Sequence, residues 1–345
     1  MNQALKIIKK VQKKNNWPHT FSFPGNLNSF LGRTTFFIFL FFANLQTSKA
    51  AEAYITNQTD STVTVIDLTS LKQTHSIQIG GKPAGIAVSG QADYAYISST
   101  EGKYISKLDL KTKQVTKLTQ LSSAPLGIAV HPNGRWLYVA DWYKHLIYVI
   151  DAANGTITAR IPVGKSPSGL DLSPNGKWLY STDRDDNQVS VINTTTNKVI
   201  ATIKTGIRPF GITVNKEGTI AYTANVKSHD VSILDLKNNK LLKSVKVGKR
   251  PYAVALAKNK AFVTDQYNET VSVMDLSSNE RVKQIDVGEY PEGIAPGPNG
   301  DYVYVACWFS NLLMKIDTTS LKVVGEVKTG DGPIQAAQRK PVPLW

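Results

Sequence analysis

The chain contains 345 residues, with 40 Lys and Arg against 26 Asp and Glu, which gives a formal net charge of +14. Its 41% hydrophobic and 19% charged residues exclude both a disordered polyelectrolyte and a membrane protein with many spans. A single cysteine, and five histidines without a metal-binding or CxxCH spacing, exclude a cysteine-rich metal site and covalent haem attachment.

The first fifty residues are typical of an export signal. They contain seven basic residues and no acidic one, then an apolar stretch at residues 36–43 and small residues at Ser48 and Ala50. The apolar stretch is under half of the roughly 20 residues that a membrane-spanning helix needs, so we expect cleavage after residue 50. Residues 51–345 then carry 33 basic and 26 acidic residues, a net charge of +7. The alternatives are an uncleaved amphipathic tail and a misassigned start codon.

The rest of the chain is a repeat of about 42 residues. A proline recurs seven times after a turn, at intervals of 42 residues with one interval of 40. An Asp or Asn that ends a Val- and Ile-rich run keeps the same intervals. The prolines are Pro83, Pro125, Pro167, Pro209, Pro251, Pro291 and Pro333. Two independent markers with one rhythm predict a repeat architecture over residues 51–345.

Each repeat contains four short β-strands. In residues 166–206 we predict strands at 169–173, 178–182, 189–193 and 199–204, because β-branched and aromatic residues alternate there between Asn-containing turns. No part of the repeat region has a sustained helical periodicity. Four strands in about 42 residues predict a propeller blade, so the fold class is all-β: a seven-bladed β-propeller with four antiparallel strands per blade.

The two ends of the repeat region complete one blade. The N-terminal end supplies three strands, at 53–56, 62–67 and 76–79, and the C-terminal end supplies a first strand at 332–338. We expect these four strands to form a composite last blade that closes the ring and removes the free edges at the junction.

The repeat motif resembles that of the YVTN-family β-propeller proteins. It reads Pro-Leu-Gly-Ile-Ala-Val at 125–130, Leu-Tyr-Val-Ala-Asp at 137–141 and Ile-Tyr-Val-Ile-Asp at 147–151. The resemblance covers residues 51–345 and implies the propeller fold, but it implies little about function because such repeats encode blade packing. It also implies export, with family roles that include surface layers, nucleic-acid binding and association with quinoprotein or haem systems.

The resemblance places function on one face of the ring, where the loops before the first strands meet the loops after the second strands. Aligned blade by blade, most positions in these loops hold turn-forming residues, and a few hold exceptions. Arginines beside aromatic rings suit an anionic, planar or stacked ligand. The candidate ligand-binding residues are Trp142, Arg184, Arg208, Phe210, Arg250, Tyr252, Tyr290 and Trp308.

These candidates have structural alternatives. Trp142 and Trp308 also suit packing between blades, and Arg208 and Arg250 also suit solvated surface charge. The acidic run at 183–186 lacks the spacing of a hard-cation loop, so we predict no metal site.

Other residues of these loops are assigned structural roles. His145 and His229 have no obvious partner in the sequence, and Cys307 replaces the Asn or Asp of its turn, with its role left open. Glycines before the prolines, such as Gly164 and Gly248, are assigned to turn geometry.

No catalytic residue and no cofactor is assigned, because GxSxG, paired-carboxylate and phosphate-loop patterns are absent from the sequence. We expect a monomeric, periplasmic or secreted binding module without enzymatic activity. Its loop face takes an anionic or polymeric ligand, with single-stranded nucleic acid the first candidate. The alternatives are a redox accessory protein or enzyme of quinoprotein or haem type, and a scaffold for protein partners in the cell envelope.

Overall fold

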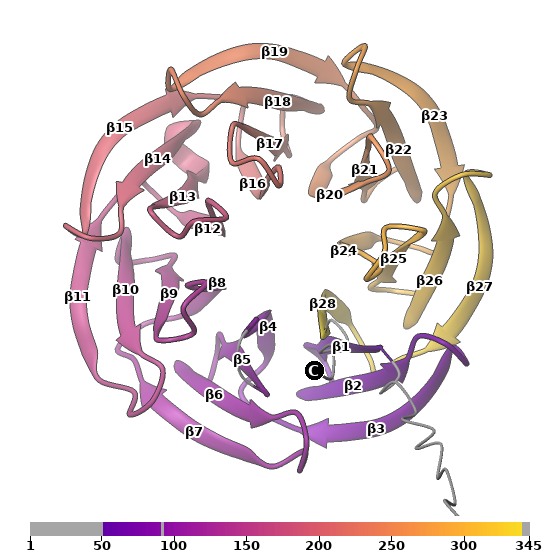
Figure 1. The fold of residues 1–345 in the computed structure, drawn as a ribbon. Helices are drawn as coiled ribbons and strands as arrows, with labels where there is room; N and C mark the ends of the chain where they lie inside the picture. The colour runs from indigo at the N-terminus through magenta and orange to yellow at the C-terminus, as the bar shows by residue number, and fades with distance from the viewer. Residues whose placement is uncertain (1–50, 91–92, 340–345) are drawn as a thin grey trace, which may run out of the picture. The chain divides into compact units, whose positions relative to one another are not determined.

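The computed structural model describes residues 51–90 and 93–339, and the predicted export signal at 1–50 lies outside them. The described residues form seven four-stranded antiparallel sheets, arranged as blades around a central axis (Figure 1). The chain is therefore the seven-bladed β-propeller that its repeat predicts.

Each blade places its first strand beside the central axis and its fourth strand at the outer rim (Figure 1). Blade 1 contains β28 (Pro333–Arg339), β1 (Glu52–Asn57), β2 (Thr62–Asp67) and β3 (Lys72–Gln78). Blade 2 contains β4 (Pro83–Val88), β5 (Tyr94–Ser99), β6 (Tyr104–Asp109) and β7 (Val115–Gln120). Blade 3 contains β8 (Pro125–Val130), β9 (Trp136–Asp141), β10 (Leu146–Asp151) and β11 (Ile157–Pro162). Blade 4 contains β12 (Pro167–Leu172), β13 (Trp178–Asp183), β14 (Gln188–Asn193) and β15 (Lys198–Lys204).

The remaining blades repeat this order. Blade 5 contains β16 (Pro209–Val214), β17 (Ile220–Asn225), β18 (Asp230–Asp235) and β19 (Lys240–Lys246). Blade 6 contains β20 (Pro251–Ala257), β21 (Lys260–Asp265), β22 (Thr270–Asp275) and β23 (Glu280–Asp286). Blade 7 contains β24 (Pro291–Pro296), β25 (Tyr302–Cys307), β26 (Leu312–Asp317) and β27 (Lys322–Lys328). One 3-10 turn, η1 (Arg184–Asp186), interrupts the pattern in blade 4.

The predicted closure of the ring is confirmed. Strand β28 pairs antiparallel with β1, so that Ala337 lies opposite Tyr54, and β1 in turn pairs with β2. The four strands predicted in residues 166–206 are all present, with ends that differ by one or two residues.

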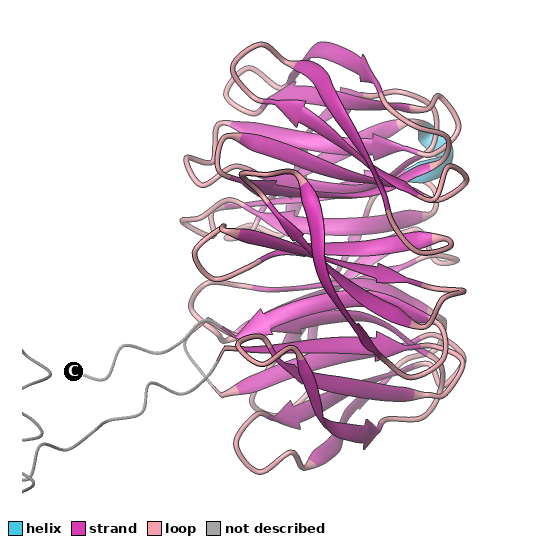
Figure 2. Ribbon diagram, turned by 90° about the vertical axis from the view of Figure 1, so that its right-hand side faces the viewer, coloured by secondary structure: helices cyan, strands magenta, loops and turns pink. Residues whose placement is uncertain are grey.

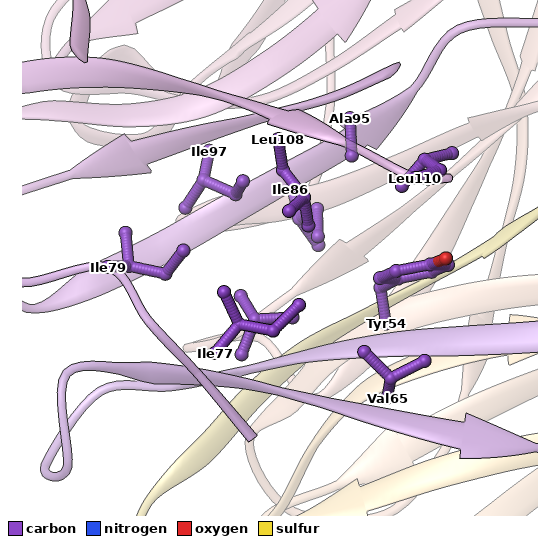
Figure 3. Packing of buried hydrophobic residues seen from close by; sticks show 10 residues of the cluster. Tyr54, Val65, Ile77, Ile79, Ile86, Ala95, Ile97, Leu108 and Leu110 are labelled. Atoms are coloured by element: carbon purple, nitrogen blue, oxygen red, sulfur yellow. The ribbon is translucent and has the colours of Figure 1, made fainter. Parts of the chain in front are cut away.

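The hydrophobic core consists of seven clusters, one at each interface between neighbouring blades. In Figure 3, Ile77 of blade 1 faces Ile86 of blade 2 across such an interface. The second strand of each blade contributes one large aromatic side chain that is at most 5% exposed. These rings are Tyr54, Tyr96, Tyr138, Tyr180, Tyr222, Phe262 and Tyr304. Because each cluster joins two neighbouring blades, each blade is stabilised by the apolar surface that it buries against its neighbours.

In five of the seven blades, one position of the first strand lies too close to the next blade for a side chain. A Cβ atom on Gly211 would lie 2.6 Å from the carbonyl oxygen of Tyr252 in the next blade. Gly85, Gly127, Gly169 and Gly293 hold the same position and meet the same obstacle. These glycines therefore allow the backbones to pack around a narrow channel.

Two loop glycines, Gly164 and Gly248, serve a different purpose from the predicted one, whereas Gly80 and Gly81 have the positive φ, 83° and 64°, that suits turn geometry. Neither Gly164 nor Gly248 has a positive φ, so turn geometry is the wrong reason for them. Their N–H groups donate to the buried carboxylates of Asp183 and Asp265, at 3.1 and 3.0 Å. A side chain on Gly248 would place its Cβ 2.6 Å from the Cβ of Asp265. Glycine is needed there because the carboxylate leaves no room.

Replacing one inter-blade ring tests the core. We expect Tyr138→Ala to lower the free energy of unfolding by about 3–5 kcal/mol, because the buried ring leaves a cavity between blades 3 and 4. Tyr143→Ala is the matched control, since its ring is 69% exposed and its loss changes stability by about 0.5 kcal/mol or less. Urea unfolding followed by circular dichroism measures both, and equal midpoints for the two variants contradict the interpretation.

Replacing a loop glycine tests the carboxylate contact. We expect Gly248→Ala to destabilise the fold by about 1–3 kcal/mol, because the new methyl group displaces Asp265 from its hydrogen bonds. Gly90→Ala is the control, because a Cβ there has no atom within 4 Å. Thermal unfolding compares the two variants, and a similar melting temperature for both rules out the steric explanation.

Candidate functional site

The loops before the first strands and after the second strands meet on one face of the ring, which we call the site face. Backbone hydrogen bonds join them: the N–H of Gln266 donates to the carbonyl of Arg250 at 3.1 Å, and that of Trp308 to the carbonyl of Tyr290 at 3.0 Å. The turn η1, cyan at the right of Figure 2, belongs to the same face. Segments of different strands thus converge around the mouth of the channel.

Hydrogen bonds of the backbone N–H groups fix the main-chain conformation of two arginines on this face. Arg208 and Arg250 precede the prolines of β16 and β20 and adopt left-handed conformations, with φ of 58° and 57°. Their N–H groups donate to Asn187 Oδ1 at 2.8 Å and to His229 Nδ1 at 3.0 Å. The histidine thus has a structural role, and His145 accepts the N–H of Ser166 in the same way. The strained backbone recurs from blade to blade, so it belongs to the fold.

The residue after each proline lies where the first strand begins, at the mouth of the channel. These residues are Ala84, Leu126, Ser168, Phe210, Tyr252, Glu292 and Ile334. The channel contains a cavity of about 170 Å³ lined by the first strands of all seven blades. Aromatic or ionisable side chains occur only at the mouth positions of blades 5, 6 and 7, which makes one side of the mouth unlike the other.

A first group of predicted residues is in contact across blades 3 to 6. The rings of Phe210 and Tyr252 stack with centroids 4.0 Å apart, and Trp142 lies 6.3 Å from Phe210. The guanidinium of Arg184 lies over the Trp142 ring at 5.3 Å. Because these rings cover part of one another, only the remaining ring surface is available to a ligand.

A second group gathers around Tyr290. Its ring lies 6.0 Å from Trp308, 5.9 Å from Tyr267 and 5.1 Å from Phe309. The Arg250 guanidinium lies over Tyr267 at 4.9 Å. Tyr267 and Phe309 are each 59% exposed and were not predicted as site residues. Both stand one position after an aligned residue of the repeat, so alignment of the next position would have found them.

All eight predicted residues therefore lie on the site face, in two contact groups with Arg208 beside the first. Arg208 is exposed, and the other seven are half-buried. The packing alternative holds in part for Trp308, since its Nε1 is covered without a hydrogen-bond partner and lies against Gly332. This side chain therefore packs against the loop that precedes β28.

The three arginines differ in their partners. Arg184 forms an ion pair with Asp185 at 2.7 Å, and Arg208 approaches the same carboxylate at 3.8 Å. Arg250 donates instead to two neutral groups, Gln266 Oε1 at 2.5 Å and the Tyr267 hydroxyl at 3.2 Å. Among the described residues no carboxylate forms an ion pair with Arg250, so its charge is the least neutralised of the three.

Glu292 is a buried acid at the mouth, 8% exposed, that was not predicted as a site residue. Its Oε1 accepts a hydrogen bond from Gln266 Nε2 at 2.8 Å. Burial raises the pKa of Glu292 to about 8, against the lowering effect of Arg250 and of the Gln266 hydrogen bond. Burial also raises the pKa of the neighbouring Tyr252 and Tyr290 hydroxyls. This side of the mouth therefore contains protonated oxygens at neutral pH.

The acidic run at 183–186 does not converge on one point. Asp183 accepts from Ser190 at 2.6 Å, Asp185 from Ser166 at 2.7 Å, and Asp186 from the N–H of Lys165 at 2.8 Å. Across residues 51–90 and 93–339, no three His, Cys, Asp or Glu side chains come together as a metal-binding group.

Cys307 is buried, and burial raises the pKa of its thiol to about 12. The thiol therefore stays protonated at neutral pH.

In the described part of the chain, no helix is long and apolar enough to cross a membrane.

The solved structures that share this fold include the following three. A protein of unknown function from Desulfotomaculum acetoxidans DSM 771 matches with a TM-score of 0.74 and 17% identity over 84% of this chain and 99% of its own. Kuenenia stuttgartiensis hydrazine synthase matches with a TM-score of 0.68 and 18% identity over 78% and 95%. The dihydro-heme d1 dehydrogenase NirN in complex with DHE matches with a TM-score of 0.62 and 15% identity over 83% and 74%. At these identities the likeness concerns the fold alone.

No curated protein matches the sequence. A family model does match, over residues 41–339, which include all seven blades and their closing strand. The chain therefore belongs to the YNCE-like beta-propeller family.

Proposed function

We propose that the protein is a binding module whose site face takes an anionic ligand with flat rings, and that single-stranded nucleic acid is the first candidate. The observation that carries this proposal is the arc of aromatic rings and arginines around one side of the channel mouth, from Trp142 to Trp308. Catalysis has no comparable support among the described residues.

The chemistry of the arc suits a strand with unpaired bases. Bases stack on any aromatic side chain without regard to sequence, at roughly 1–3 kcal/mol for each base. Arginines beside the rings bind phosphates through charge-assisted hydrogen bonds. The exposed side chains of Tyr267 and Phe309 enlarge the aromatic surface of the site face, which supports an elongated ligand.

A second candidate is a planar cofactor, which would make the protein a redox accessory or enzyme. The support for this candidate is that the fold is shared with a dehydrogenase described in complex with DHE. An absorbance spectrum of protein purified from its native host separates the two candidates, because a bound quinone or haem absorbs visible light.

Export to the periplasm or the outside of the cell, a monomeric state and membership in the YVTN repeat class remain parts of this proposal. A role as a scaffold for envelope proteins is the further alternative, for which the loops and outer strands suffice.

The stacking surface is tested by the anisotropy of a labelled single-stranded oligonucleotide, titrated with residues 51–345 at two salt concentrations. We expect binding that weakens with salt but persists in part, because stacking adds to phosphate contacts. Trp142→Ala should weaken it by about 1–3 kcal/mol.

Trp136→Ala is the matched control. It removes a tryptophan from the other end of the same strand, β9, away from the site face, and we expect it to leave the affinity unchanged. Binding that salt abolishes entirely, or that both variants weaken equally, contradicts a stacking site.

A further inference from the structure

The hydrogen bonds of Arg250 fix the orientation of a buried amide. Arg250 only donates hydrogen bonds, so the Gln266 atom that it contacts at 2.5 Å must be the amide oxygen. The Gln266 nitrogen then faces Glu292 and donates to its Oε1 at 2.8 Å. Gln266 is 1% exposed, so water does not compete for either bond. The chain Arg250–Gln266–Glu292 has therefore only one arrangement of donors and acceptors.

This arrangement places the acid proton of Glu292. Since Oε1 accepts from Gln266, the neutral acid carries its proton on Oε2. Oε2 has no hydrogen-bond partner among the described residues, and it is not one of the fully covered unpaired atoms. An O–H donor thus remains unused at the start of β24, in the same chain of contacts as the least neutralised arginine.

We propose that Arg250 and the Oε2 atom of Glu292 form one anion subsite, in which the guanidinium supplies charge and the carboxylic acid donates a hydrogen bond to an oxygen of the ligand. The inference rests on the proposed function and names the group recognised there: an oxyanion such as a phosphodiester. Glu292 determines specificity, because an ionised carboxylate at the same place repels an oxyanion.

The groups that face Glu292 come from three loops and one strand. Arg250 precedes β20, Tyr252 lies on β20, Gln266 follows β21, and Tyr290 precedes β24. Arg250 is the charge among them at neutral pH, and it favours the ionised acid. Burial opposes it and keeps the pKa of Glu292 at about 8. The subsite is therefore complete at pH 7 and loses its donor as the pH rises through 8.

The test is the ratio of the dissociation constants at pH 9 and pH 7 for a labelled deoxycytidylate oligonucleotide, whose bases do not titrate in this range. In the wild-type protein, about one molecule in eleven retains the Glu292 proton at pH 9, so we expect a ratio of about ten. Glu292→Gln has a neutral donor at every pH and should give a ratio near one. Arg250→Ala should weaken binding at pH 7 more than Arg184→Ala does.

Glu289→Gln is the matched control for charge. It removes an exposed carboxylate three residues away, in the loop before β24, and should keep the ratio of the wild-type protein. A ratio that is the same in the wild-type protein and in Glu292→Gln overturns the subsite.

Inorganic sulfate tests the subsite apart from nucleic acid, because its charge is constant over this range. We expect sulfate to raise the melting temperature of the wild-type protein at pH 7 but not at pH 9, relative to Arg250→Ala, which reports the general effect of the salt. If sulfate gives this result and the oligonucleotide does not bind, the proposed function is wrong and the subsite stands. No specific effect of sulfate at pH 7 overturns the subsite.

The protonation state is tested without any ligand. Glu292 has a folded-state pKa above its ordinary value of 4.5, so the folded protein keeps this proton up to a higher pH than the unfolded chain does. The wild-type protein should therefore lose stability relative to Glu292→Gln as the pH rises from about 4.5 to 8, and the difference should then level off. A difference that is constant over this window means that Glu292 is ionised in the folded protein, and it overturns the proposal.

Discussion

The convergence of seven first strands on one axis is the constraint on which the rest of the structure depends. Backbones meet there so closely that glycine is needed beside the neighbouring strand, as at Gly211 and Tyr252. Five of the seven first strands have glycine at this position. The aromatic residues Phe210 and Tyr252 and the acid Glu292 lie where their strands begin, at the mouth. The geometry of closure thus decides where a binding site can form.

The fold could be predicted because each position of the repeat has the same packing role in every blade. The aromatic ring of the second strand, Tyr138 in blade 3, fills the same inter-blade space seven times, so its period in the sequence is the period of the structure. Closure was predictable for the same reason. The glycines were visible too, but the reason for Gly248 was not, because it depends on the carboxylate of Asp265 from another strand.

The site could be predicted only in part. Departures from the repeat identified residues that lie on one face, because the fold brings equivalent positions together. The contacts between these exceptional residues could not be predicted from the sequence. The stacking of Phe210 on Tyr252 and the neutral partners of Arg250 depend on the directions in which the side chains point. The acid Glu292 was aligned but not recognised, since its protonation depends on burial by residues from three separate segments.

The pairing of β28 with β1 has a consequence for how the molecule forms. Blade 1 takes strands from both ends of the described chain, so its sheet stays incomplete until the last strand has been synthesised. The other six blades can assemble one after another as an open arc, with the apolar faces of blades 2 and 7 uncovered at its ends. Joining the ends closes a loop of almost the whole domain, at an entropic cost that rises only slowly with length. The ring therefore closes only when β28 joins β1.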